Sequence, residues 1–134
     1  MTVRGRFRRL AISRMASAAA AAAWTWIAVR KLRRSLAAHG VAAPRPRAVK
    51  LPGTGAKGVA WALDRSNATC LERSLIWQAR VLAQSGWAPD VIVGVRVSRV
   101  EELPTDAARD LAHAWLDGEP APGYQEIHRL KALP

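Results

Sequence analysis

The distribution of charge divides this sequence into two parts of different character. Of its 21 lysine and arginine residues, 13 lie in residues 1–63, which contain no aspartate or glutamate; the other 8 share residues 64–134 with all 10 acidic residues. A basic segment of this kind attracts nucleic acid, anionic lipid or an acidic protein, and charge alone does not choose among them. A chain of 134 residues can build one domain around a single core. We therefore expect one domain with a basic appendage.

The basic part predicts a helical arm followed by a linker. Charged stretches flank an uncharged run, Met15–Val29, that consists largely of alanine and is shorter than the roughly 20 residues a membrane-spanning helix needs. Basic residues follow this run at once, which argues against an export signal. Because alanine has the highest helix propensity, we predict a helix that ends at Gly40. Proline and glycine mark residues 41–58 as a linker.

The segment "NATCLERSLIWQARVLAQSG", residues 67–86, contains the single cysteine. One cysteine and three scattered histidines form neither an internal disulfide nor a zinc motif, which favours a reducing, cytoplasmic compartment and predicts no metal or cofactor. Apolar residues at helical spacing predict a helix that is capped by Asn67 or Thr69 and ends at Gly86. Cys70 then lies in the first turn, where unpaired N–H groups and the helix dipole favour a thiolate. A buried packing role is the alternative.

Three later segments have the pattern of strands. "DVIVGVRV", from residue 90, is a run of β-branched residues with its valines on one face. In "LAHAWL", residues 111–116, alternation places His113 on one face with Leu111 and Trp115. "DGEPAPG" reads as a turn, and "YQEIHRL" as a returning strand. The resulting expectation is an α+β fold.

The order of these motifs carries a resemblance. The helix-start cysteine in "ATCLERSLIWQARVLAQSG", then "DVIVGVRV" and "AHAW", resemble the transglutaminase-like cysteine peptidases of lasso-peptide biosynthesis, which remove the leader peptide before macrolactam closure. The basic arm and Pro-Arg linker are similar to those of the short members that lack a fused recognition domain. The resemblance covers about residues 59–130. It implies a transglutaminase/papain-like domain at 59–134, a cysteine helix packed on a small antiparallel sheet, after an arm and linker at 1–58.

The same resemblance implies the active-site residues and the partners. Cys70 matches the nucleophile, and His113 in "AHAW" matches the base that takes and returns protons. The partners it implies are the leader region of the precursor peptide, a separate leader-recognition protein and a macrolactam-forming cyclase.

The residue that would orient His113 is less well defined. The family usually has an aspartate on the strand after the histidine, where this chain has Gln125 beside Glu126. A wide loop over residues 117–122 would pair His113 directly with Glu126, and the prolines in this loop favour that arrangement over a two-residue hairpin. Glu126 is therefore the predicted third catalytic residue. Asp117, or no acidic residue at all, remains an alternative.

Other functions and other residues stay open at this point. The domain could be a non-catalytic scaffold that presents the precursor to a cyclase, or the arm could bind nucleic acid or a membrane surface. The arm lacks a groove-reading motif and interleaved aromatic residues, so we interpret it as a docking surface. Trp24 and Trp26 indicate either core packing or an interface. We interpret Trp77, Trp87 and Trp115 as core or cleft walls.

Overall fold

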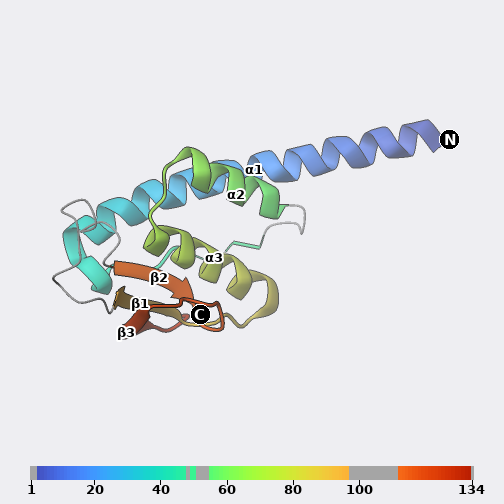
Figure 1. The fold of residues 1–134 in the computed structure, drawn as a ribbon. Coiled ribbons are helices and arrows are strands. Elements are labelled where there is room, and N and C mark those ends of the chain that lie inside the picture. Colours follow the sequence, from blue (N-terminus) through green and yellow to red (C-terminus); the bar gives the residue numbers. More distant parts are fainter. Residues whose placement is uncertain (1–2, 48, 51–54, 97–111, 134) are drawn as a thin grey trace.

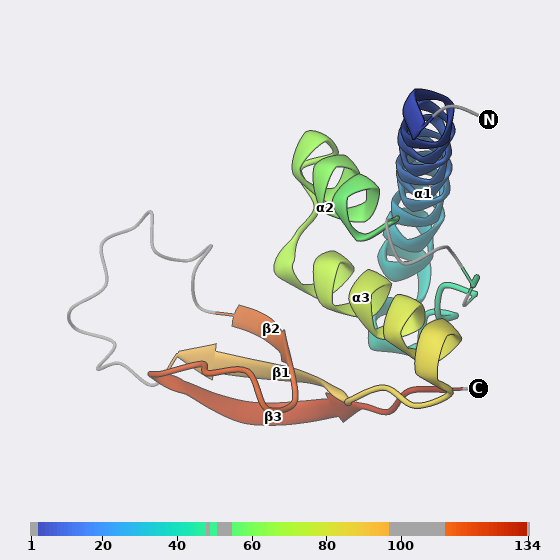
Figure 2. The ribbon, with the colours of Figure 1, turned by 90° about the vertical axis from the view of Figure 1, so that its right-hand side faces the viewer.

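The described part of the chain contains three α-helices and a three-stranded antiparallel sheet, which confirms the predicted α+β class. The computed structural model describes residues 3–47, 49–50, 55–96 and 112–133, with side chains from residue 12 onward. Figure 2 shows α3 between the sheet below it and the pair formed by α1 and α2 above it. The elements are α1 (Val3–His39), a 3-10 turn η1 (Gly40–Ala42), α2 (Ala56–Arg65), α3 (Cys70–Ser85), β1 (Val91–Arg96), β2 (Ala112–Leu116) and β3 (Tyr124–Leu130).

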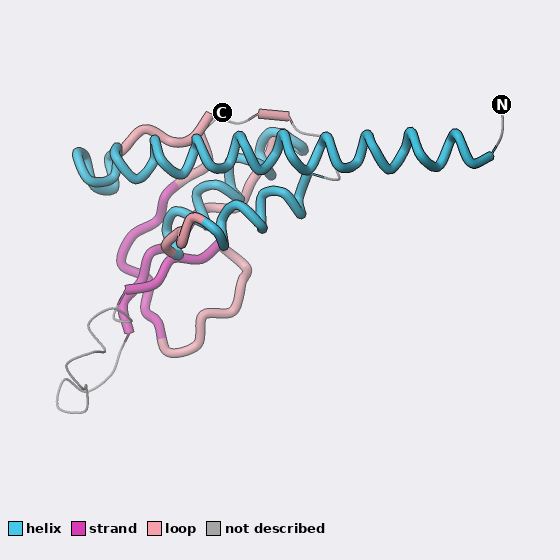
Figure 3. The backbone as a smooth tube through the Cα atoms, turned by 90° about the horizontal axis from the view of Figure 1, so that it is seen from above, coloured by secondary structure: helices cyan, strands magenta, loops and turns pink. Residues whose placement is uncertain are grey.

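Helix α1 is the predicted alanine-rich helix, and it ends one residue before Gly40, which has φ +58°. Its N-terminal part extends past the other elements in two views (Figure 1 and Figure 3). Its middle crosses α2 closely: a Cβ on Gly58 would overlap the backbone carbonyl of Ala18. None of the described helices combines the length and the apolar character needed to cross a membrane.

One hydrophobic core joins α1 to the rest of the chain. Ala21, Val29 and Leu32 of α1 are buried in the same cluster as Val59 and Leu63 of α2 and the inner residues of α3 and the sheet. The predicted boundary between the arm and linker (1–58) and the domain (59–134) therefore runs through a single hydrophobic core. Burial of this apolar surface is the main stabilising contribution that α1 makes.

The predicted linker is shorter than expected and is held to the domain. Helix α2 begins at Ala56, so residues 56–58 are helical rather than part of a connection. Arg45 donates a hydrogen bond to Oε1 of Gln78 at 3.2 Å and another to the carbonyl of Lys131 at 2.5 Å. These contacts attach the proline-rich segment to α3 and to the chain end beyond β3.

The order of the strands is β2-β1-β3, and this corrects the predicted pairing of the last two strands. His113 and Glu126 both lie opposite Gly94 of β1, one on each side. The chain turns after β2, where the Glu119 N–H donates to the Leu116 carbonyl at 2.9 Å. It then passes to the far edge of β1, so the direct pairing of His113 with Glu126 expected from a wide loop is wrong. The valine-rich strand takes the centre because its residues are the best suited to burial between neighbours.

The two faces of the sheet have different roles. Val91, Ala114 and Leu130 point toward α3 and belong to the core. His113 and Trp115 share the opposite face, as their alternation predicts. Residues Val97 and Leu111, which were included in the predicted strands, lie outside the described residues.

Candidate functional site

Cys70 is the first residue of α3, as predicted, and Thr69 is the cap. The Thr69 hydroxyl accepts a hydrogen bond from the Glu72 N–H at 3.3 Å, and the Glu72 carboxylate accepts one from the Thr69 N–H at 2.9 Å. This reciprocal capping box defines where the helix starts. The Cys70 thiol is free and half-buried, so the cap holds it at the helix N-terminus within reach of solvent.

An arginine from α1 completes the cap. Arg33 contacts the Glu72 carboxylate with two hydrogen bonds of 2.9 Å each, and it also donates to the Ser66 carbonyl at 3.2 Å. The Glu72 side chain is only 4% exposed. Burial alone would raise the pKa of Glu72, but the hydrogen bonds from Arg33 and Thr69 and the charge of Arg33 lower the pKa below its ordinary value. The spacing of Thr69 and Glu72 is a capping signal that can be read from the sequence. The sequence analysis did not identify Arg33 as a partner of this cap.

The helix start also offers hydrogen-bond donors. Within the described residues, the N–H groups of Cys70 and Leu71 have no acceptor, as is usual in a first helical turn. Such groups stabilise negative charge that develops beside the thiol. The arrangement therefore provides a thiol and two hydrogen-bond donors within one turn.

Cys70 and His113 border the same cavity, whose volume is about 410 Å³. The cavity is lined by Cys70, Arg73, Ser74 and Trp77 of α3, by His113, Ala114, Trp115 and Leu116 of β2, and by Glu119 and Pro120. Because residues from both faces of β2 take part, the cavity follows the outer edge of this strand. The Ser74 hydroxyl donates to the Ala114 carbonyl at 3.2 Å and joins α3 to β2 at this point. The tertiary fold thus brings together the two principal residues predicted from the sequence.

The imidazole of His113 is held by aromatic rings. Its ring centre lies 5.7 Å from that of Trp115, in a stacked geometry, and 5.0 Å from that of Tyr124. These contacts place the ring on the sheet face opposite α3, and no hydrogen bond between Cys70 and His113 occurs in the described part of the chain. The two residues are therefore neighbours across a cavity edge rather than a formed thiol–imidazole pair. Hydrogen bonds of this kind are often long or unformed without substrate.

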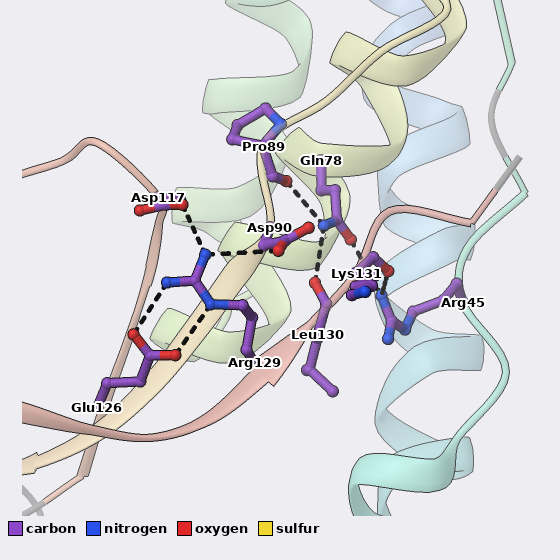
Figure 4. A network of polar contacts seen from close by, with 9 residues as sticks. All are labelled: Arg45, Gln78, Pro89, Asp90, Asp117, Glu126, Arg129, Leu130 and Lys131. Carbon is purple, nitrogen blue, oxygen red and sulfur yellow. Dashed lines mark hydrogen bonds and ion pairs between the residues drawn. The ribbon is translucent and has the colours of Figure 1, made fainter.

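Both acidic candidates for the third residue bind Arg129 instead of His113 (Figure 4). The Glu126 carboxylate takes two hydrogen bonds from this guanidinium at 2.9 and 3.0 Å, and Asp117 takes one at 2.6 Å. These bonds, first Glu126 and then Asp117, raise the pKa of Arg129 above its ordinary value. The register places Glu126 and His113 on strands separated by β1, about 10 Å apart in Cα position. Neither carboxylate borders the cavity.

Two buried polar residues of α3 were also missed. Gln78 is 3% exposed and donates to the Pro89 and Leu130 carbonyls at 2.9 and 3.1 Å, which fixes α3 to the end of the sheet where β1 starts and β3 stops (Figure 4). Arg80 is 3% exposed and packs over the ring of Trp77 at 6.0 Å; burial lowers the pKa of its guanidinium. A polar residue on an otherwise apolar helix face is the sequence signal that identifies such positions.

The tryptophan predictions have mixed outcomes. Trp77 and Trp115 line the cavity, which confirms them as cleft walls. Trp87 is 70% exposed, so its interpretation as a core or cleft residue is wrong. Trp24 packs against the core, whereas Trp26 is 39% exposed.

The described residues contain no group of three or more histidine, cysteine, aspartate or glutamate side chains arranged to hold a metal ion. Comparisons with protein-family models, with curated proteins and with solved structures found no match for this chain. Its function is therefore inferred from the residues around the cavity and from the motifs they belong to.

Proposed function

We propose that this protein is a cytoplasmic cysteine peptidase with a transglutaminase-like core, and that it removes the leader from a lasso-peptide precursor. The observation that carries the proposal is the shared cavity of Cys70 and His113, which come from separate elements more than 40 positions apart in the sequence. The order of the motifs supplies the substrate class. The proposed partners are the leader region, a separate leader-recognition protein and a macrolactam-forming cyclase.

The proposed chemistry uses the groups present at the start of α3. His113 accepts the thiol proton, and the Cys70 sulfur attacks the carbonyl carbon at the end of the leader. Negative charge moves to the carbonyl oxygen, where the Cys70 and Leu71 N–H groups stabilise it. His113 then protonates the leaving amine, and the leader remains as a thioester on Cys70. A water molecule, deprotonated by His113, hydrolyses the thioester and regenerates the thiol.

This mechanism requires a change at His113. The imidazole must turn from Trp115 and Tyr124 toward Cys70, which its position on an edge strand allows because no further strand covers that side in the described sheet. No carboxylate forms a hydrogen bond or an ion pair with the ring among the described residues; its aromatic neighbours position it. A precursor lying in the cavity would complete the approach of the two groups.

The test is cleavage of the precursor, measured by mass spectrometry with the recognition protein present. Cys70→Ala and His113→Ala should both abolish release of the leader, because each removes a group that takes part in bond breaking. His128→Ala is the matched control: this histidine is exposed on β3 and does not border the cavity, so cleavage should persist. Glu126→Gln should keep the rate within about threefold of the parent, since its carboxylate binds Arg129. Full cleavage by His113→Ala would overturn the assignment of the base.

A non-catalytic scaffold is the second candidate, and two observations favour it. Both acids that could orient His113 are bound to Arg129, and His113 is turned away from α3. A scaffold would bind the precursor and support ring closure of an already trimmed substrate, with Cys70→Ala as active as the parent. Loss of leader release in Cys70→Ala, with unchanged binding of the precursor, would instead support the peptidase.

A further inference from the structure

A second hollow in the molecule lies between α1 and α2 and shares no residue with the cavity of Cys70 and His113. Its volume is about 680 Å³. The residues that line it are Ala18, Ala19, Ala22, Ala23 and Trp26 of α1 and Lys57, Gly58 and Trp61 of α2. We call this hollow the α1–α2 groove.

The α1–α2 groove has an apolar floor and aromatic walls. The four alanines recur at i, i+1, i+4 and i+5, so they form one face of α1 and leave space above it. Trp61 is 55% exposed and Trp26 is 39% exposed. Large aromatic side chains that remain exposed beside an apolar hollow are typical of a surface that binds a partner.

The charge around the α1–α2 groove has one sign. Every residue that lines it comes from residues 1–63, which contain no acidic residue, and Lys57 is at its edge. The Arg65 guanidinium lies 5.6 Å from the centre of the Trp61 ring. Asp64 is the nearest acid in sequence, and it is paired with Arg73 at 2.8 Å. A ligand of the α1–α2 groove therefore meets apolar surface with uncompensated positive charge around it.

The positive charge and the shape of the α1–α2 groove indicate which kind of molecule can bind there. A second copy of the chain would bring an identical positive surface and be repelled, because like charges opposed across an interface disfavour association. A bilayer is flat and cannot fill a concave hollow, whereas a helix can enter one with its apolar face. Acidic side chains on the other faces of such a helix would pair with the basic edge.

We propose that the α1–α2 groove binds an acidic amphipathic helix of a partner protein. Apolar side chains of that helix, spaced i, i+3, i+4 and i+7, lie on the alanine floor between Trp26 and Trp61. Its carboxylates pair with Lys57 and Arg65. This binding site does not depend on the peptidase activity and uses none of its residues.

The experiment uses the full chain and a designed, fluorescently labelled peptide. The peptide has about 18 residues, long enough for a marginal helix, with leucine at the four spacings and glutamate at most other positions. A second peptide has the same composition in an order that scatters the leucines around the helix. Binding is measured by fluorescence anisotropy in about 0.15 M salt, so that charges are screened as they are at physiological ionic strength. The amphipathic peptide should bind at least tenfold more tightly than the scattered one.

Two substitutions on α1 provide matched variants. Ala19→Glu places a carboxylate in the α1–α2 groove, and Ala20→Glu places the same charge on the next residue, which is exposed and outside it. Binding should weaken about tenfold or more in the first variant and less than about threefold in the second. Circular dichroism and thermal unfolding of both variants should match the parent, because both alanines are exposed.

The remaining outcomes each overturn the proposal. Equal binding of the two peptides, or equal weakening by the two substitutions, would show a general attraction to anions. Binding to vesicles of phosphatidylglycerol and phosphatidylcholine, with no binding of the amphipathic peptide, would identify a membrane surface. A concentration-dependent dimer in sedimentation that Ala19→Glu disrupts would identify a second copy of the chain.

Discussion

The ion pair between Arg33 and Glu72 connects the basic helix to the start of the helix that carries Cys70, and Arg33→Met tests its contribution. Methionine retains most of the apolar stem but leaves the buried carboxylate without its two hydrogen bonds of 2.9 Å. Hydrogen bonds to charged groups contribute about 1.5–3 kcal/mol each. Arg33 is 49% exposed, so solvent screening reduces the expected total to about 2–3 kcal/mol of unfolding free energy.

The loss of unfolding free energy in Arg33→Met should depend on pH in a defined direction. The pKa of Glu72 is lowered in the folded state. The ionised side chain therefore contributes its full share of the unfolding free energy above the unfolded-state pKa of about 4.3, and this contribution is lost as the pH falls through the folded-state pKa. The difference in stability between the parent and Arg33→Met should therefore be largest near neutral pH. It should shrink as the pH falls below the unfolded-state value, because the carboxyl then becomes protonated and no longer needs the arginine.

The measurement is urea unfolding followed by circular dichroism near pH 7 and near pH 3.5. Arg34→Met is the control, because it removes the same charge from an exposed neighbour that has no partner in the described part of the chain. The reasoning is refuted if the two variants differ by less than about 0.5 kcal/mol at neutral pH. A difference that grows on acidification would refute it as well.

Three further predictions follow from the packing. Gly58→Ala should lower the unfolding free energy by about 1–3 kcal/mol, since its Cβ meets the Ala18 backbone; Ala60→Ser, on the exposed side of α2, should leave the denaturation midpoint unchanged. A chain lacking residues 1–40 loses part of the shared core and should show no cooperative unfolding transition, whereas a sigmoidal transition would make α1 a separable arm. Iodoacetamide should label native Cys70 within about tenfold of the rate in urea; mass spectra showing labelling only after unfolding would support a packing role.

Much of the local structure could be predicted because it depends on neighbours in the sequence. The cap at Thr69, the left-handed end of α3 at Gly86 with φ 72°, and the position of Cys70 in the first turn all follow from residues a few positions apart. The shared face of His113 and Trp115 follows from strand alternation. These features can be read without any long-range contact, although Arg33 strengthens the cap once the helices pack.

The same reasoning could not predict which strands are neighbours. Alternation specifies the faces of a strand, but the order in a sheet depends on which edges bury the most apolar surface once all elements are packed. The chain therefore crosses from β2 to the far side of β1. That crossing separates His113 from Glu126 and delivers Glu126 to Arg129.

The sequence by itself determined α1, the helix that presents Cys70 and the three strand segments, because propensity, capping and alternation act over a few residues. It did not predict α2, whose first residues were assigned to the linker. Only the tertiary structure decided that α1 belongs to the core, that Arg33 closes the cap of α3 from 39 positions away, and that Cys70 and His113 meet at one cavity. Those contacts join residues far apart in the chain, and each forms only when the apolar faces of several elements are buried together.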